Sequence, residues 1–127
     1  MGARCVRLAA QGTAGAFQGL VQKVPVQPGE TYTACAQLVN FREQPLTGTA
    51  FAQLVVEWLS AGEQEVGRNW SGRFGLDLSQ MHWSRIALQK IEAPKDAAMA
   101  RIGIHLFDGE RESSGSILIY RMQLLGP

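Results

Sequence analysis

Apolar and polar side chains alternate along residues 21–39, VQKVPVQPGETYTACAQLV, and one Pro-Gly pair interrupts the pattern. Val24 and Val26 fall on one face of an extended chain and Lys23 on the other, because successive side chains of a strand point to opposite faces. After the Pro-Gly pair the alternation resumes. The stretch therefore predicts two half-buried strands separated by a turn.

Similar segments recur along the whole chain, with Gly, Pro, Ser and charged residues between them. A short stretch at residues 77–83 could form one helical turn capped by Asp77 or Ser79. Evenly spaced strands without longer helices predict an all-β fold, an eight-stranded antiparallel β-sandwich or jelly roll. The expected strands are Ala3–Leu8, Gly19–Val26, Thr31–Asn40, Ala50–Leu59, Glu65–Asn69, Trp83–Ile91, Ala98–Phe107 and Ser116–Leu124.

The length of 127 residues suits a single domain, which we take to span residues 1–127. Twelve Lys and Arg residues face eleven Asp and Glu residues, so we expect no basic surface for nucleic acid. No segment approaches the run of about 20 apolar residues that crosses a bilayer, so we expect no membrane partner. Cys5 and Cys35 are either two buried thiols, the reading we favour, or one disulfide.

The same alternation predicts the core and the polar faces. Amides, a carboxylate and an imidazole on one sheet face suit hydrogen bonds to a polyhydroxylated ligand, although an ordinary solvated face carries the same residue types. The expected core residues are Val6, Leu8, Val24, Val26, Leu54, Val56, Trp58, Ile86, Leu88, Ile102, Ile104 and Leu106. The expected polar row is Gln37, Gln53, Glu57, Gln89 and His105.

Trp70 differs from the other tryptophans because no apolar periodicity directs it inward. It lies in residues 67–75, GRNWSGRFG, which we interpret as a loop. With Arg68, Asn69 and Arg73 nearby, its indole suits stacking on a sugar ring while its neighbours bind the hydroxyls. The alternative is a loop residue that covers one end of the core.

Sequence motifs for catalysis are missing. Neither His82 nor His105 stands in a metal-ligand spacing, and no G-x-S-x-G or phosphate-binding glycine loop occurs. Glu57 and Asp108 are both acidic, as glycoside hydrolysis requires, but nothing in the sequence brings them together. We therefore expect no enzyme and no catalytic or metal-ligating residue. A stand-alone glycosidase is kept as an alternative hypothesis.

Five segments, in order, resemble the carbohydrate-binding modules of families 4, 9, 16 and 22, which share a galactose-binding-like β-sandwich. They are GARCVRL, FQGLVQKVPVQPGETYTACAQL, AQLVVEWLSAGEQEVG, HWSRIALQKIEAPKDAAMARIGIHL and GSILIYRMQL. The resemblance implies a non-catalytic module that binds plant or cell-wall polysaccharide of the β-glucan, xylan or mannan class. It also implies a covalently linked glycoside hydrolase as partner, and secretion as part of a larger protein.

The chain departs from these families in three places. No strand with Asn, an aromatic residue and Glu precedes Gly2. Tyr120 and Arg121 stand where relatives often carry an acidic residue that helps to hold calcium, so we expect no cofactor and a lower chance of structural calcium. Gln37 replaces a typical aromatic residue, so the ligand class is not carried over. The second hypothesis is a structural or protein-interaction β-sandwich of a larger assembly, such as a phage-tail component.

Overall fold

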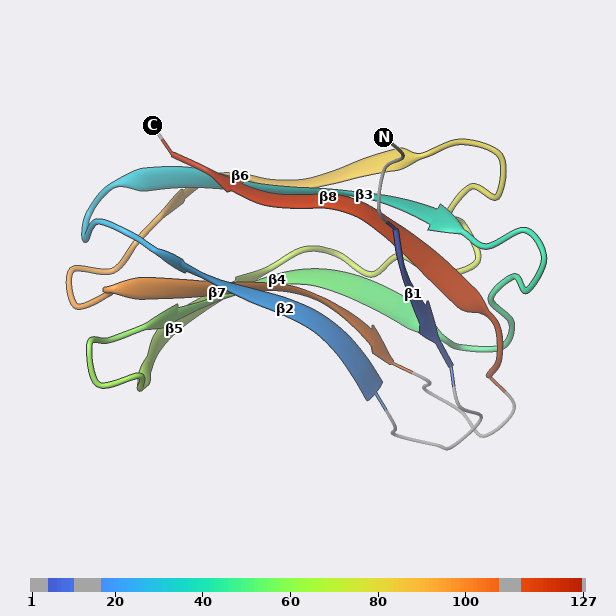
Figure 1. The fold of residues 1–127 in the computed structure, drawn as a ribbon, viewed down its shortest axis with the longest axis horizontal. Helices are drawn as coiled ribbons and strands as arrows, with labels where there is room; N and C mark the ends of the chain where they lie inside the picture. Colours follow the sequence, from blue (N-terminus) through green and yellow to red (C-terminus); the bar gives the residue numbers. More distant parts are fainter. Residues whose placement is uncertain (1–4, 11–16, 108–112, 127) are drawn as a thin grey trace.

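The computed structural model describes residues 5–10, 17–107 and 113–126, and for residues 17 and 18 the backbone only. Two β-sheets lie face to face (Figure 1), and the described residues contain no helix, which confirms the expected fold class. The strands are β1 (Val6–Ala9), β2 (Phe17–Pro25), β3 (Thr31–Asn40), β4 (Phe51–Leu59), β5 (Glu65–Trp70), β6 (Ser84–Glu92), β7 (Met99–Phe107) and β8 (Ser116–Leu125).

Each sheet has four strands, and every pairing is antiparallel. Sheet A has the order β1-β8-β3-β6, and sheet B has the order β2-β7-β4-β5. The chain crosses from one sheet to the other at every connection except the one between β4 and β5. Strands that neighbour in sequence therefore mostly lie in opposite sheets, as in a jelly roll.

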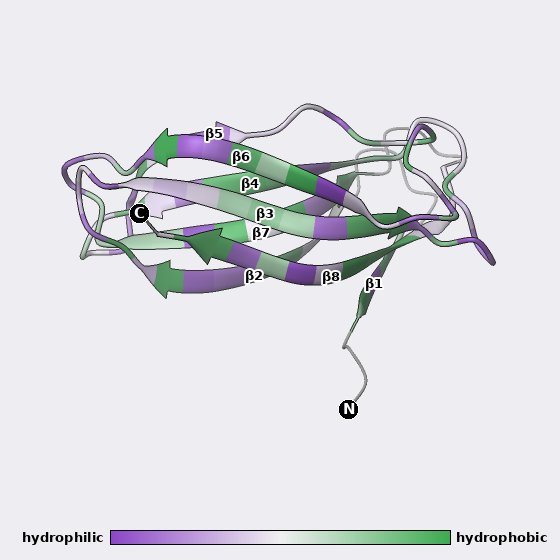
Figure 2. Ribbon diagram, turned by 90° about the horizontal axis from the view of Figure 1, so that it is seen from above, coloured by the Kyte–Doolittle hydropathy of each residue, from purple (hydrophilic) through white to green (hydrophobic). Residues whose placement is uncertain are grey.

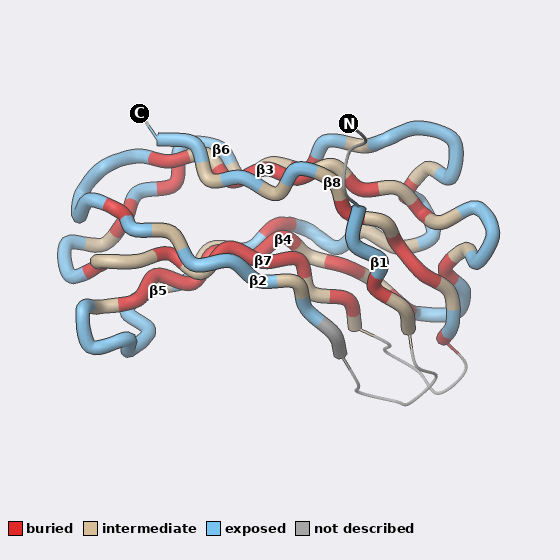
Figure 3. The backbone as a smooth tube through the Cα atoms, viewed as in Figure 1, coloured by how far each residue is buried: buried red, intermediate tan, exposed pale blue. Residues whose placement is uncertain are grey.

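The core lies between the two sheets, where Figure 3 shows the buried segments facing each other. Its largest member is Trp58, which is 1% exposed. Most of the expected core residues are buried, and Val24 and Leu88 are partly buried against the core. Val6 is an exception at 40% exposure, because it begins a four-residue strand at the edge of sheet A.

The Pro-Gly turn between β2 and β3 is confirmed. Gly29 has φ of 78°, and the Glu30 amide donates to the Gln27 carbonyl, as in a turn with proline second and glycine third. The two flanking strands do not pair with each other, however, and lie in different sheets. β2 pairs with β7 in sheet B, and β3 pairs with β6 and β8 in sheet A.

Two further expectations need correction. Residues 77–83 form bends rather than a helical turn, and the Ser79 hydroxyl accepts hydrogen bonds from the amides of Met81 and His82. Cys35 is buried as expected, but Cys5 is exposed, and both thiols are free. A search of the described chain for a helix long and apolar enough to cross a membrane found none.

Candidate functional site

The outer face of sheet B carries most of the residues that could bind a ligand. Three rows of outward side chains cross its strands in register. The first row joins Gly19, His105 and Gln53, the second joins Val21, Gly103, Val55 and Trp70, and the third joins Lys23, Arg101, Glu57 and Arg68. The rows place an imidazole, an indole and a charged cluster on one surface, which we call the sheet B face.

The expected polar row is divided between the two sheets. Gln53, Glu57 and His105 lie on the sheet B face. Gln37 of β3 and Gln89 of β6 belong to sheet A, so the five side chains do not form one row. Local alternation is the same in both sheets, and only long-range pairing decides to which sheet a strand belongs.

Trp70 ends strand β5 and does not lie in a loop. It is paired with Val55 of β4 and is 59% exposed, which makes it an accessible aromatic surface on the sheet B face. The guanidinium carbon of Arg68 lies 5.9 Å from the centre of its ring. A cation at this distance from an indole has a favourable electrostatic interaction with the ring face.

The other predicted site residues near Trp70 lie on both sides of sheet B. Asn69 points inward, where its Oδ1 accepts a hydrogen bond of 2.7 Å from the Trp58 indole. Arg73 follows β5 and places its guanidinium carbon 4.3 Å from the centre of the Phe51 ring. Arg68 and Arg73 are therefore associated with outward aromatic side chains, whereas Asn69 supports the core.

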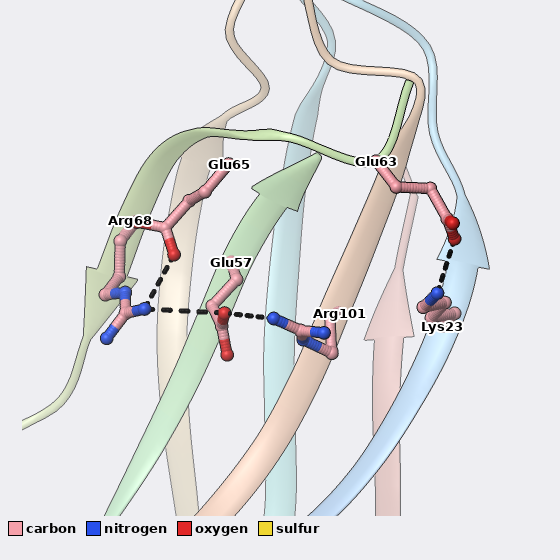
Figure 4. A network of polar contacts seen from close by, with 6 residues as sticks. All are labelled: Lys23, Glu57, Glu63, Glu65, Arg68 and Arg101. Atoms are coloured by element: carbon pink, nitrogen blue, oxygen red, sulfur yellow. Dashed lines mark hydrogen bonds and ion pairs between the residues drawn. The ribbon is translucent and has the colours of Figure 1, made fainter. Parts of the chain in front are cut away.

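A network of charged side chains crosses one end of the sheet B face (Figure 4). Arg101 donates to Glu57 Oε2 at 2.6 Å, and Arg68 approaches the same oxygen at 3.4 Å from the other side. Arg68 also pairs with Glu65, and Lys23 pairs with Glu63, each at 2.6 Å. Three cations thus meet three carboxylates, so the network carries no net charge.

Glu57 is the buried centre of this network, with 6% of its surface exposed. Burial has the largest single effect and would raise the pKa of its carboxyl group. The hydrogen bond and charge of Arg101, together with the charge of Arg68, outweigh burial and hold the pKa of Glu57 below its ordinary value. The side chain is therefore an anion near neutral pH, and it aligns both guanidinium groups.

His105 lies over two glycines, Gly19 of the neighbouring strand β2 and Gly103 of its own strand β7. A Cβ on Gly19 would lie 3.2 Å from its ring, and a Cβ on Gly103 would lie 3.4 Å from its Nε2. Burial lowers the pKa of His105, and the charges of Arg68 and Arg101 lower it further, against the opposing effect of Glu57. The imidazole is therefore neutral at pH 7 and can both donate and accept a hydrogen bond.

The same surface is hollowed beside this imidazole. A hollow of about 560 Å³ is lined by Gly19, Val21, Glu57, Arg68, Arg101, His105 and Phe107. Beyond His105, Phe51 and Phe107 stack with ring centres 4.9 Å apart. Aromatic side chains thus lie at two places on the sheet B face, with polar groups between them.

Gln53 has a partly structural role. Its side-chain nitrogen donates to the Ser71 carbonyl at 2.9 Å, which connects β4 to the segment that follows Trp70. Among the contacts of the described residues, its amide oxygen and its second N–H stay available to a ligand.

The sequence-based site did not include several members of this face. They are Gly19, Val21, Lys23, Phe51, Val55, Arg101, Gly103 and Phe107. Arg101 has the same strand parity as His105, a signal that could have placed it on the surface. Its pairing with Glu57 depends on the register between β4 and β7, which no local pattern contains.

Catalysis or metal binding would need several His, Cys, Asp or Glu side chains at one place. Among the described residues, no group of three His, Cys, Asp or Glu side chains is placed to hold a metal ion. Asp108, the suggested partner of Glu57 in glycoside hydrolysis, lies outside the described residues. The expectation about calcium likewise stays a prediction.

Sequence comparison gives no relative, since no family model matches the chain and no curated protein is similar to it. Comparison with solved structures, in contrast, finds similar proteins. The C-terminal domain of EclA, a sugar-binding protein, matches with a TM-score of 0.62 at 11% identity over 98% of this chain and 79% of that chain. The chain has the β-sandwich fold of carbohydrate-binding modules.

Two further structures extend this comparison. The CBM22-1-GH10 modules of Clostridium thermocellum xylanase 10B, complexed with xylohexaose, match with a TM-score of 0.56 at 18% identity over 83% of this chain and 19% of that chain. The enzymatically active domain of tailspike protein 4 from bacteriophage CBA120 matches with a TM-score of 0.66 at 16% identity over 91% of this chain. This chain spans 14% of that tailspike chain. The fold is therefore shared by sugar-binding modules and by parts of larger proteins.

Proposed function

We propose that the chain binds a polysaccharide on the sheet B face and does not cleave it. The observation that carries this proposal is the exposed indole of Trp70 beside the fixed guanidinium groups of Arg68 and Arg101, on a fold shared with sugar-binding modules. An indole stacks on the apolar face of a sugar ring, while charged groups held in place form hydrogen bonds with its hydroxyls.

Glu57 is well suited to the polar part of this recognition. Both arginines contact its Oε2, so its Oε1 is available to accept from a sugar hydroxyl. Because the carboxylate and the guanidinium groups already hold one another, little side-chain entropy is lost when a ligand binds. Neutral His105 adds a polar imidazole ring from the first row, beside the hollow.

The charge balance of the site supports a neutral ligand. Three cations and three carboxylates cancel within the charged network at one end of the sheet B face. Polysaccharides of the β-glucan, xylan or mannan class carry hydroxyls without a formal charge, and they match a surface that offers aromatic rings and paired ionic groups. We propose that the ligand belongs to this class.

The chemistry of Glu57 supports binding without hydrolysis. A glycosidase needs one carboxyl group that stays protonated as a general acid. The lowered pKa of Glu57 favours the opposite state.

We further propose that the domain is secreted as part of a larger protein and directs an attached glycoside hydrolase to its substrate.

Affinity gel electrophoresis with soluble β-glucan, xylan and mannan tests this function. At least one polysaccharide should retard the wild-type chain, and Trp70→Ala should weaken binding about ten- to a hundredfold, as expected for an aromatic anchor. Met81→Ala is the matched control, because Met81 is also a large exposed apolar residue, at 67%, and lies outside the sheet B face. It should bind as the wild type does.

Two outcomes would contradict the proposal. One is the lack of retardation by every neutral polysaccharide in the panel, which would favour a structural role in a larger assembly, as the tailspike likeness allows. The other is release of reducing sugar from a bound polysaccharide, which would replace the binding function with an enzymatic one.

A further inference from the structure

The outer face of sheet A carries a second group of aromatic and polar side chains. Gln37 of β3 is paired with Arg85 of β6 on one side and with Tyr120 of β8 on the other. Trp83 immediately precedes β6, and its ring centre lies 5.7 Å from that of Tyr120. In Figure 2, which views this sheet from above, hydrophilic segments interrupt β3, β6 and β8.

A β-bulge brings Arg121 to the same surface. The register between β3 and β8 shifts between Cys35 and Gln37, so that β8 holds one extra residue. Arg121 occupies this position with φ of 55°, a left-handed conformation that is strained for a residue with a side chain. Its guanidinium carbon lies 5.1 Å from the centre of the Tyr120 ring. The bulge thus places a cation next to the aromatic pair.

Among the described residues, the two arginines of this surface have no ionic partner. Neither Arg85 nor Arg121 forms an ion pair with a carboxylate of the described residues, although Arg68 and Arg101 of the sheet B face are both paired. Glu92 lies opposite Thr31, six residues along β3 from Gln37, which is about 20 Å at the usual rise of a strand. The surface around Gln37 is therefore cationic.

Polar groups of the same surface also lack partners. Within the described part of the chain, no hydrogen bond uses the Gln37 amide, the Trp83 indole nitrogen or the Tyr120 hydroxyl. Two small hollows meet at Gln37, one of about 230 Å³ beside Trp83 and Tyr120 and one of about 260 Å³ beside Arg85 and Arg121. Aromatic rings that contact each other and polar groups without a hydrogen bond to the described residues thus converge on one place.

We propose that this surface is a second binding site, which takes a saccharide with an anionic group. Trp83 and Tyr120 would stack on the sugar ring, and Gln37 would bind its hydroxyls. Arg85 and Arg121 would bind a carboxylate or a sulfate, since a guanidinium group matches either anion with two parallel hydrogen bonds. The two sheets would then bind different saccharides, a neutral one on sheet B and an acidic one on sheet A.

Binding to polygalacturonate, dextran sulfate and neutral xylan, measured by calorimetry at low salt, tests the second site. Low salt is needed because the Debye length falls to about 8 Å at 0.15 M, which screens exposed charges. Polygalacturonate or dextran sulfate should bind the wild-type chain, and comparing the two distinguishes a carboxylate ligand from a sulfate ligand. Double-stranded DNA, compared at an equal concentration of anionic groups, serves as a polyanion without sugar hydroxyls on its exposed face.

Two variants remove the cations. Arg85→Gln and Arg121→Gly should each weaken binding of the acidic saccharide about tenfold and leave neutral binding unchanged. Arg121→Gly also relieves the left-handed backbone, so its fold is expected to be at least as stable as that of the wild type. Arg42→Gln is the control, since Arg42 is exposed on the turn after β3 and its loss removes the same charge elsewhere.

The test separates this site from the proposed neutral site. Trp70→Ala should leave binding of the acidic saccharide intact. Four results would each overturn the proposal. The first is a loss of acidic binding with Arg42→Gln as large as that with Arg85→Gln, and the second is its loss with Trp70→Ala. The third is binding of DNA as strong as that of the acidic saccharide, and the fourth is no binding of either acidic saccharide. None of these results affects neutral binding on sheet B, which is measured separately with xylan.

Discussion

The indole nitrogen of Trp58 donates a hydrogen bond of 2.7 Å to Oδ1 of Asn69. Trp58 is the largest fully buried side chain, so this bond satisfies the polar atom of the bulkiest core residue. Because successive side chains of a strand point to opposite faces, the inward position of Asn69 directs Arg68 and Trp70 outward. One contact in the core therefore helps to fix what β5 displays to solvent.

The first prediction concerns this contact. Asn69→Ala should lower the free energy of unfolding by about 1–3 kcal/mol, because the buried indole loses its acceptor. Trp58→Ala should cost more, about 3–5 kcal/mol, through the cavity that it leaves. Urea denaturation measures both. Trp70→Ala is the control for a tryptophan on the surface and should change stability by less than about 0.5 kcal/mol; a loss as large as that of Trp58→Ala would contradict the assignment of faces.

The second prediction concerns the carboxylate between two arginines. Glu57→Gln keeps the shape of the side chain but removes the charge that Arg101 and Arg68 share. Stability should fall by about 1–2 kcal/mol, and affinity for a neutral polysaccharide should fall about tenfold, because the guanidinium groups lose their common anchor. Thermal unfolding and affinity electrophoresis measure the two effects.

Lys23→Gln provides the control for the second prediction. It breaks an exposed ion pair with Glu63 in the same network, and such pairs contribute little to stability. It should leave both stability and binding close to those of the wild type. If Lys23→Gln and Glu57→Gln had equal effects, the buried carboxylate would have no special role.

The sequence predicts where the strands lie along the chain, but it does not predict how they pair into two sheets. Alternation predicted Thr31–Asn40 with both of its ends, because inward and outward side chains differ clearly in polarity there. Gln37 and Gln53 sit in equally regular strands, yet one faces outward from sheet A and the other from sheet B. Sheet membership depends on pairing with strands far along the chain, and no local pattern encodes it.

Trp70 shows a second limit of local patterns. The inward positions of β5 are Gly67 and Asn69, and neither looks like a core residue in the sequence. Trp58 needs an acceptor at position 69. Space at position 67 is tight, since a Cβ there would lie 3.1 Å from Pro94 Cγ and 3.3 Å from Trp58 Cδ1. The sequence therefore predicts a strand over Glu65–Asn69 but leaves Trp70 in a loop, because no apolar inward residue marks the end of β5.

The third prediction concerns stability in acid. The pKa values of His105 and Glu57 are both lowered in the folded chain. The unfolded chain therefore binds protons more readily, and stability must decrease as the pH falls. For His105 the loss begins near its ordinary value of 6.5 and continues through its folded pKa, and for Glu57 it begins near 4.5. Unfolding measured from about pH 8 to about pH 2 should show the two steps.

His105→Gln isolates the first of these steps. A neutral side chain at position 105 should remove the decrease that starts near pH 6.5 and keep the one at lower pH. His82→Gln is the control, because His82 is exposed and lies outside the sheet B face. A wild-type pH profile in His105→Gln, or a flattened one in His82→Gln, would contradict the assignment of this step to His105.

The last prediction concerns Gly103, which lies between Val21 and Val55 at the centre of the sheet B face. A Cβ there would lie 2.9 Å from Val21 Cγ1, 3.0 Å from the Leu20 carbonyl oxygen and 3.4 Å from His105 Nε2. The carbonyl belongs to a paired strand and cannot move away without disturbing its pairing. Gly103→Ala should therefore cost about 1–3 kcal/mol of stability, as overpacking commonly does.

The same change should displace the imidazole of His105 toward solvent. The pKa of His105 would then return toward its ordinary value, because burial is the main cause of its decrease. Titration of the histidine by NMR measures this shift, and affinity electrophoresis should show weaker binding of neutral polysaccharide. Gly72→Ala is the control, since a Cβ on Gly72 meets nothing within 4 Å. If Gly103→Ala left stability, titration and binding unchanged, close packing over this glycine would not shape the site.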